Sequence, residues 1–206
     1  MKIIERGLLS FQEKHFFVPI RDKIDYVRIL VLGARQLLLN IEMEEEEQKS
    51  SLKLVVDKMS RLFFYKEEKF FSISFPFIVL IEDNEIKEIS SYSGKKLNNK
   101  SISAILSIIE SEQFKINPSL IDFYIEPTSI ESSGVFLLEE IFQFEPSYIR
   151  YDFDPENEKG LLHPLNHLDV NYSQHSTFKI GLKEAINQNY FEDMQNTNTE
   201  CKFIDS

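Results

Sequence analysis

The chain has very little of what several common classes of site require. Its 206 residues include one cysteine, no tryptophan and six glycines. The lone Cys201 cannot form an internal disulfide or a cysteine-rich zinc site, because both need several sulfurs at one point. The glycines are scattered, whereas a phosphate-binding loop or a dinucleotide fingerprint needs closely spaced glycines between a strand and a helix. These absences exclude several well-defined kinds of active site.

Long apolar runs are also missing. No stretch approaches the roughly 20 apolar residues that a membrane-spanning helix needs, and Glu5 and Arg6 lie where a signal peptide would be apolar. A single cysteine is usual in a reducing compartment. We therefore expect a cytoplasmic protein without membrane contact.

Positive charge is scarce as well. The chain has 23 lysines and arginines against 34 aspartates and glutamates, a formal net charge of −11 at pH 7. Proteins that bind nucleic acid place Lys and Arg against phosphates, so the overall field of this chain opposes such binding. Nucleic acid is expected to bind only locally, if at all. A protein partner or a homo-oligomer fits the charge better.

Apolar side chains are abundant. Hydrophobic residues make up 42% of the chain and include 18 phenylalanines, which is too much apolar material for a disordered protein. The length suits one sizeable core. We therefore predict a single domain over residues 1–206, with a mostly helical part at 1–69, an antiparallel-sheet part with helices at 70–194 and a polar tail at 195–206.

Hydrophobic periodicity predicts an α+β fold. Apolar residues recur every 3.6 positions over Asp22–Ile41 and again over Leu52–Phe63, on either side of a glutamate-rich run at 42–48. This pattern predicts an N-terminal helical hairpin. After Phe70 the period changes to alternation, which predicts a mainly antiparallel sheet on which the hairpin packs.

Shorter elements are expected in the rest of the chain. The predicted strands are 73–81, interrupted by Pro76, then Ile86–Tyr92, Leu120–Glu126, Tyr148–Phe153, His167–Tyr172 and Thr177–Ile180. One helix is predicted to begin after an N-cap at Ser101. Two more are predicted over Ser132–Phe142 and Lys183–Met194.

The segment from Tyr148 to His175 is the one concentrated candidate for chemistry. Three of the chain's four histidines lie there, although His175 is in a polar stretch and is expected to be a solvated turn residue. Side chains alternate between the two faces of a strand, and sequential strands pair antiparallel. Two neighbouring strands should therefore share one polar face that carries Arg150, Asp152, Asp154, His167 and Asp169, with His163 at its rim.

Two chemistries could use this face. In the first, His163, His167 and Asp169 bind a divalent metal that acidifies a water molecule. In the second, His163 or His167 acts as a general acid or base without a metal, and Arg150 stabilises charge on a phosphoryl group. Asp152 and Asp154 would then orient a histidine or bind a cation. A half-solvated antiparallel sheet also displays such polar neighbours for purely structural reasons.

The runs Arg150–Pro155 (RYDFDP) and His163–Leu168 (HPLNHL) resemble the C-terminal signature of a bacterial family of unknown function. In that family an RYD-x-DP element precedes HP-x-x-HL, and small toxins of toxin–antitoxin pairs show a looser similarity, with RYD before paired histidines. Downstream, the family has a basic Arg-Ile-Pro strand, whereas this chain retains only Lys179. The resemblance implies a bacterial protein encoded among mobile or defence genes, and it implies no reaction.

Two functions follow as hypotheses. The first is a defence or toxin-like effector that hydrolyses a phosphodiester or nucleotide through the His/Asp/Arg cluster, with a divalent metal as the candidate cofactor. The second is a non-catalytic subunit that binds a larger protein through its helical hairpin and acidic surface.

Overall fold

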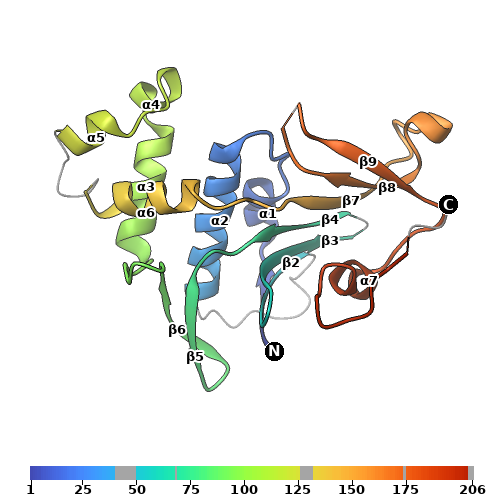
Figure 1. The fold of residues 1–206 in the computed structure, drawn as a ribbon, viewed down its shortest axis with the longest axis horizontal. Helices are drawn as coiled ribbons and strands as arrows, with labels where there is room; N and C mark the ends of the chain where they lie inside the picture. The colour runs from blue at the N-terminus through green and yellow to red at the C-terminus, as the bar shows by residue number, and fades with distance from the viewer. Residues whose placement is uncertain (40–49, 68, 126–131, 174, 204–206) are drawn as a thin grey trace. The chain divides into compact units, whose positions relative to one another are not determined.

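The computed structural model describes residues 1–39, 50–67, 69–125, 132–173 and 175–203 (Figure 1). The chain forms two compact units. The first comprises Met1–Lys14, Met43–Ser74 and Ser147–Ser206, and the second comprises His15–Glu42 and Phe75–Pro146. A short helix, α1 (Ser10–Phe16), contains the first boundary between them. The expectation of a single domain stays a prediction.

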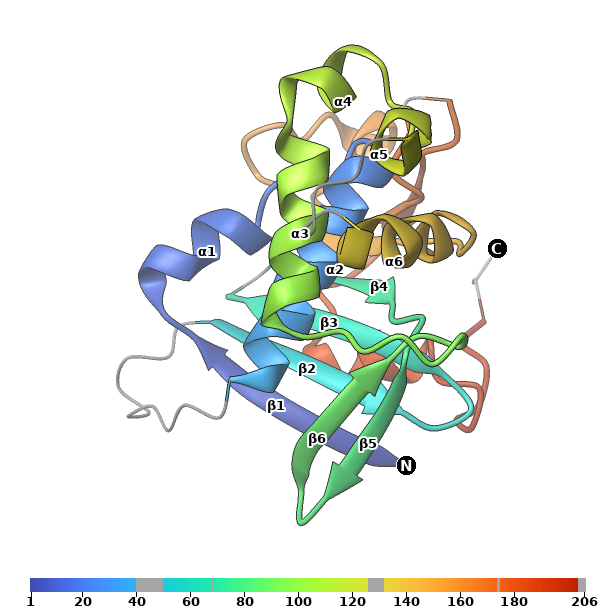
Figure 2. The same ribbon diagram turned by 90° about the vertical axis from the view of Figure 1, so that its left-hand side faces the viewer.

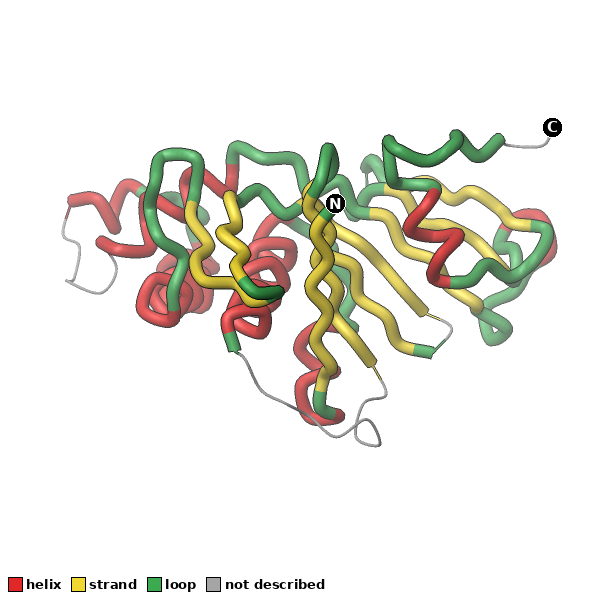
Figure 3. The backbone as a smooth tube through the Cα atoms, turned by 90° about the horizontal axis from the view of Figure 1, so that it is seen from below, coloured by secondary structure: helices red, strands yellow, loops and turns green. Residues whose placement is uncertain are grey.

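The first unit is built on a seven-stranded sheet in which every neighbouring pair is antiparallel (Figure 3). Its strands, in spatial order, are β1 (Lys2–Leu8), β2 (Ser50–Val56), β3 (Ser60–Lys66), β4 (Lys69–Ser74), β7 (Ile149–Phe153), β8 (Asn166–Val170) and β9 (Phe178–Leu182). A 3-10 turn, η2 (Gly160–Leu162), and a helix, α7 (Gln188–Asp193), complete it. Together with the helices of the second unit, this confirms the predicted α+β class with a mainly antiparallel sheet.

One face of this sheet packs against α7. Phe63, Phe70, Tyr151 and Leu168 are at most 3% exposed and contact Phe191 of α7 or one another in a single apolar cluster. Phe191 meets the rings of Phe63 and Phe70 edge-on. Tyr151 and Leu168 point into this core, so the polar residues that alternate with them in β7 and β8 lie on the opposite face.

The predicted helix over Leu52–Phe63 is wrong, because this segment forms β2 and β3. Leu52, Leu54 and Val55 are all at most 2% exposed, so apolar residues occupy both faces of β2. A strand that is buried on both faces loses the alternation that marks a half-exposed strand, and its spacing can imitate a helix. The predicted helical hairpin therefore does not form, and the described part of residues 1–69 is not mostly helical.

The second unit contains α2 (Lys23–Leu38), α3 (Asn99–Glu110), α4 (Glu112–Ile116), α5 (Ile121–Ile125), α6 (Ser132–Phe142) and a hairpin of β5 (Ile78–Glu82) and β6 (Glu85–Ser90). Figure 2 shows α3 beside α2 and α6. The prediction of α6 is confirmed residue for residue. The first helix predicted from the apolar stripe over Asp22–Ile41 is α2, which Asp22 caps and which ends at Leu38.

Other predicted boundaries in the chain are corrected. Leu120–Glu126 was expected as a strand, but its described part forms the five-residue helix α5, which is too short for periodicity to distinguish from a strand. Asn98, not Ser101, caps α3, and Ser101 completes the capping box. Pro76 separates β4 from β5, which belong to different sheets. The closing helix shortens to α7. None of the helices among the described residues has the length and apolarity needed to cross a bilayer.

Candidate functional site

The strands β7 and β8 pair antiparallel and share the polar face that alternation predicts. Arg150 lies opposite Asp169, and Asp152 lies opposite His167. On the far side of β8, Lys179 of β9 lies opposite Asp169. Directly opposed residues share a sheet face, so three strands bring these side chains together. We call these five residues the strand-face cluster.

Arg150 holds the two carboxylates of the cluster in place. Its Nη2 donates to Oδ2 of Asp169 at 2.5 Å, and its Nε lies 2.6 Å from Oδ2 of Asp152 in an ion pair that lacks hydrogen-bond alignment. Burial lowers the pKa of Arg150, but the charges of Tyr148, Asp152 and Asp169 raise it above its usual value. Both carboxylates are about 5% exposed. The guanidinium contacts Oδ2 of Asp152 and Oδ2 of Asp169, and neither Oδ1 atom contacts it.

His167 is held in one tautomer. Its Nδ1 lies 2.8 Å from the carbonyl oxygen of Pro164, and because a carbonyl can only accept, Nδ1 carries the proton and donates it. The other ring nitrogen, Nε2, therefore presents a lone pair in the neutral ring. The imidazole is 1% exposed, so the surrounding strands and loop fix its orientation.

Lys179 places its ammonium against that lone pair. The Nζ atom lies 2.8 Å from Nε2 of His167 and 2.7 Å from Oδ1 of Asp169. Burial raises the pKa of the Asp169 carboxyl, but the hydrogen bond from Lys179 and the charge of Arg150 outweigh burial and hold it below its usual range. A cation thus already lies between two atoms that are typical metal ligands.

The ring of Pro164 packs closely on the backbone of Gly181, and this contact positions the loop before β8. Gly181 lies opposite His167 in the register of β8 and β9. A Cβ atom added at Gly181 would lie 2.9 Å from Cγ of Pro164. Glycine therefore allows Pro164 to pack on β9, and this contact brings the Pro164 carbonyl within reach of the His167 ring.

His163 belongs to a separate pair at the rim. Its Nε2 lies 3.1 Å from Oδ2 of Asp154, and its ring is 4.7 Å from that of His167 at an interplanar angle of 79°. Asn157 donates three further hydrogen bonds to Asp154, one from its backbone and two from its side-chain amide. Slight burial raises the pKa of Asp154, and the hydrogen bonds from Asn157 and His163 lower it overall. Asp154 thus faces His163 rather than the strand-face cluster.

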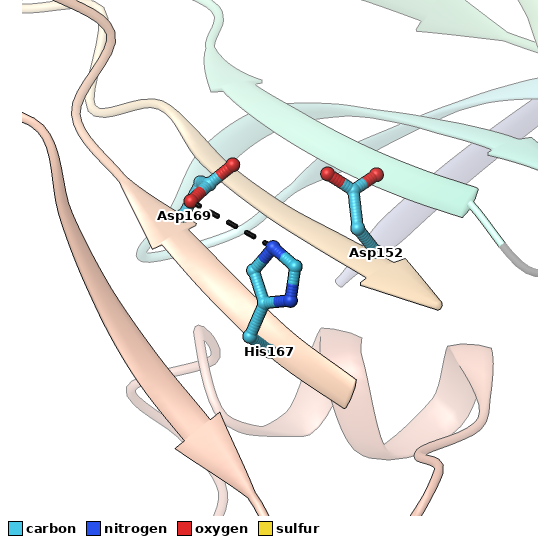
Figure 4. A group of neighbouring side chains, drawn as sticks. All are labelled: Asp152, His167 and Asp169. Carbon is cyan, nitrogen blue, oxygen red and sulfur yellow. Dashed lines mark ion pairs between the residues drawn. The ribbon is translucent and has the colours of Figure 1, made fainter. Parts of the chain in front are cut away.

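Asp152, His167 and Asp169 form the group best suited to a metal among the described residues. Each offers one ligand atom, and these atoms lie within 4.8 Å of one another (Figure 4). Two carboxylates and one imidazole suit several divalent ions. The sequence predicted His163, His167 and Asp169, so the structure places Asp152 where His163 was expected.

One carboxylate oxygen of Asp152 can still accept an interaction in this group. Its Oδ1 is buried and accepts no hydrogen bond from the described residues. The ammonium of Lys69, on β4, approaches it only to 3.5 Å, and the Lys69 side chain is 53% exposed. A buried carboxylate oxygen without a donor is costly, and a cation would relieve that cost.

Two cations of the site escaped sequence reasoning. Lys179 was noted as a lone basic residue without a contact, although alternation in the strand that follows β8 would have placed it beside His167. Lys69 gives no signal, because nothing in the sequence indicates that β4 is the neighbour of β7. His175 is exposed in a turn, as expected.

A cavity of about 550 Å³ lies on the other face of the sheet. Phe70, Tyr151 and Phe153 line it together with the segment 185–189 and Glu67. No Lys or Arg is among these lining residues, so this cavity lacks the cationic side chains that are gathered at the strand-face cluster.

No protein-family model matches the chain, and neither a curated protein nor a solved structure matches it. The chemistry of the strand-face cluster therefore carries the functional argument.

Proposed function

We propose that the chain is a metal-assisted hydrolase of a phosphodiester or nucleotide. The observation that carries the proposal is the convergence of Asp152, His167 and Asp169, whose ligand atoms lie within 4.8 Å of one another on buried side chains. A metal ion at that point would lower the pKa of a bound water and polarise a phosphoryl oxygen. The role of defence or toxin-like effector, which the motif resemblance implies, belongs to the same proposal.

The reaction balances as a simple hydrolysis. Asp152, His167 and Asp169 would hold the metal, which would supply a water for attack on phosphorus, and one proton of that water would pass to solvent. The bond between phosphorus and the ester oxygen breaks, and the leaving oxygen takes a proton from solvent. An alcohol and a phosphate are the products, and no oxidant or reductant is needed.

The geometry favours a different role for Arg150 from the one the sequence indicates. Its guanidinium contacts Asp152 and Asp169, so it would orient two metal ligands rather than hold the phosphoryl group. Lys179 and Lys69 have the more accessible cations, with side chains 34% and 53% exposed. These two ammonium groups would bind the phosphoryl oxygens.

His163 would contact the substrate. It is partly exposed beside the cluster, and Asp154 fixes its ring through Nε2. Its ring lies 4.7 Å from that of His167, so a substrate bound at the cluster would come near it. In this proposal His163, oriented by Asp154, contacts the substrate, and His167 binds the metal.

The charge of the chain limits the size of the substrate. A net charge of −11 repels a long polyanion. A small nucleotide or a short phosphodiester meets mainly the local field, in which Arg150, Lys179 and Lys69 surround two carboxylates. A small substrate is therefore the favoured one.

Hydrolysis of bis(4-nitrophenyl) phosphate and of a panel of nucleotides, with Mn²⁺ and with EDTA, tests the proposal. Asp152→Asn and His167→Gln should each lower the Mn²⁺-dependent rate at least about 100-fold. His175→Ala, which removes an exposed histidine, is the matched control and should keep the wild-type rate. Activity that survives EDTA or Asp152→Asn contradicts the proposal, and melting temperatures show whether each variant folds.

The second hypothesis is a non-catalytic interaction subunit. The helical hairpin expected to bind its partner does not form, but α4 and α5 expose apolar side chains that could do so. Ile116, Ile121 and Ile125 of α4 and α5 are 83%, 65% and 70% exposed. Exposed apolar groups of this kind favour association with a protein. Light scattering tests whether the chain is a homo-oligomer and whether Ile121→Ser with Ile125→Ser makes it a monomer; a monomeric wild-type chain contradicts self-association.

A further inference from the structure

The Lys179 ammonium occupies the position that a metal ion would take. It lies 2.8 Å from Nε2 of His167 and 2.7 Å from Oδ1 of Asp169, and both atoms are candidate ligands. A divalent ion about 2.1 Å from the same two atoms would overlap the ammonium and repel it. Metal binding at this group therefore requires Lys179 to leave.

Lys179 is free to leave without breaking the core. It lies on β9, the last strand of the sheet in spatial order, and its side chain is 34% exposed. Its flexible four-carbon stem can carry the charge outward. Arg150 keeps its hold on Oδ2 of both carboxylates meanwhile, so the remaining ligands stay in position.

A phosphoryl anion would make this departure easier. In water alone, Lys179 would exchange charged hydrogen bonds for hydration. Beside a phosphoryl oxygen it would form a new charge-assisted hydrogen bond. The anion therefore favours the arrangement in which the ligand atoms of His167 and Asp169 are available to a metal.

We infer that Lys179 acts as an internal cation that excludes divalent metal until a phosphoryl anion draws it away, so that metal and substrate bind with positive coupling. The inference rests on the proposed function and adds how the metal enters. By linkage, the anion tightens metal binding by the same factor as the metal tightens anion binding.

The test is Mn²⁺ binding to the full chain by electron paramagnetic resonance, with and without dimethyl phosphate, a phosphodiester anion with little affinity for metals. In the wild type, the anion should tighten Mn²⁺ binding at least about fivefold. Lys179→Met should bind Mn²⁺ about tenfold more tightly than the wild type without the anion, and the anion should then change affinity less than about twofold.

Lys183→Met is the matched control, because it removes an exposed lysine just past the end of β9 that has no part in the strand-face cluster. It should keep the coupling of the wild type. Lys179→Gln is a second replacement in case the methionine variant does not fold.

The outcomes separate the inference from the proposed function. Absence of Mn²⁺ binding in the wild type with the anion and in folded Lys179 variants overturns the metal centre and the proposed function with it. Tight binding that neither the anion nor Lys179→Met alters overturns only the role of Lys179. If the coupling persists undiminished in Lys179→Met, it arises from direct contact between metal and anion. That result also overturns the role of Lys179.

Discussion

The Nε2 atom of His167 lies 2.8 Å from the ammonium nitrogen of Lys179, across the pairing of β8 and β9. Because Nδ1 of the same ring donates to Pro164, this contact joins a lone pair to a cation. The cluster is therefore a closed network in which Arg150 and Lys179 neutralise two buried carboxylates. The contribution of these charges to stability can be measured.

Arg150→Met should strongly destabilise the protein. It leaves Asp152 and Asp169 buried without the guanidinium that bridges them, and breaking a buried pair costs about 3–5 kcal/mol. Because the Arg150 side chain is 23% exposed, we expect the lower end of that range from urea unfolding at neutral pH. Replacing both aspartates with asparagine in the same background should recover part of the loss. A loss below about 1 kcal/mol contradicts the bridging role.

Gly181→Ala should disturb His167 without touching it. The added methyl group would lie 2.9 Å from Cγ of Pro164 and push the covering loop outward, at a cost of about 1–3 kcal/mol. The hydrogen bond from Nδ1 of His167 to Pro164 should lengthen, and the ¹⁵N chemical shifts of the ring should report a mixture of tautomers. Pro164→Ala in the same chain removes the clashing ring and should restore much of the stability. Unchanged ring shifts in Gly181→Ala would argue against this coupling.

Stability should fall in alkali because of Tyr65. Burial and a 2.5 Å hydrogen bond to Glu192 raise the pKa of Tyr65 far above the usual 10.0. The folded state thus keeps a proton that the unfolded state loses, so this contribution is complete below about pH 10 and is lost as pH rises further. Tyr65→Phe should cost about 1 kcal/mol at pH 8 and flatten the alkaline decline in urea unfolding. Tyr92→Phe, at an exposed ring, is the control; equal slopes in both variants contradict the assignment.

The shared polar face of β7 and β8 could be predicted because each strand has one apolar and one polar face. Tyr151 and Leu168 point into the core, and this alone sends Asp152 and His167 to the other side. In β2 the alternation is interrupted, because Val55 is buried on the same face as the less buried Ser51 and Lys53.

Other parts of the site depend on contacts that periodicity does not encode. The pairing of His163 with Asp154 is set by the path of the loop between β7 and β8. The approach of Lys69 to Asp152 depends on β4 lying beside β7, a pairing of strands that are far apart in the sequence. Sequence reasoning therefore identified the polar face and four residues of the strand-face cluster, but neither Lys179 nor the pairing of Asp154 with His163.

The position of β9 at the border of the sheet has a consequence for how the site opens. A border strand is bonded to one neighbour, so it is the strand that separates most readily in local fluctuations. Lys179 is carried by that strand, whereas the two carboxylates and His167 belong to interior strands. Lys179 and the two atoms that it contacts, Nε2 of His167 and Oδ1 of Asp169, thus lie on strands of different local stability. Transient separation of β9 from β8 would carry the ammonium away from these two candidate ligand atoms.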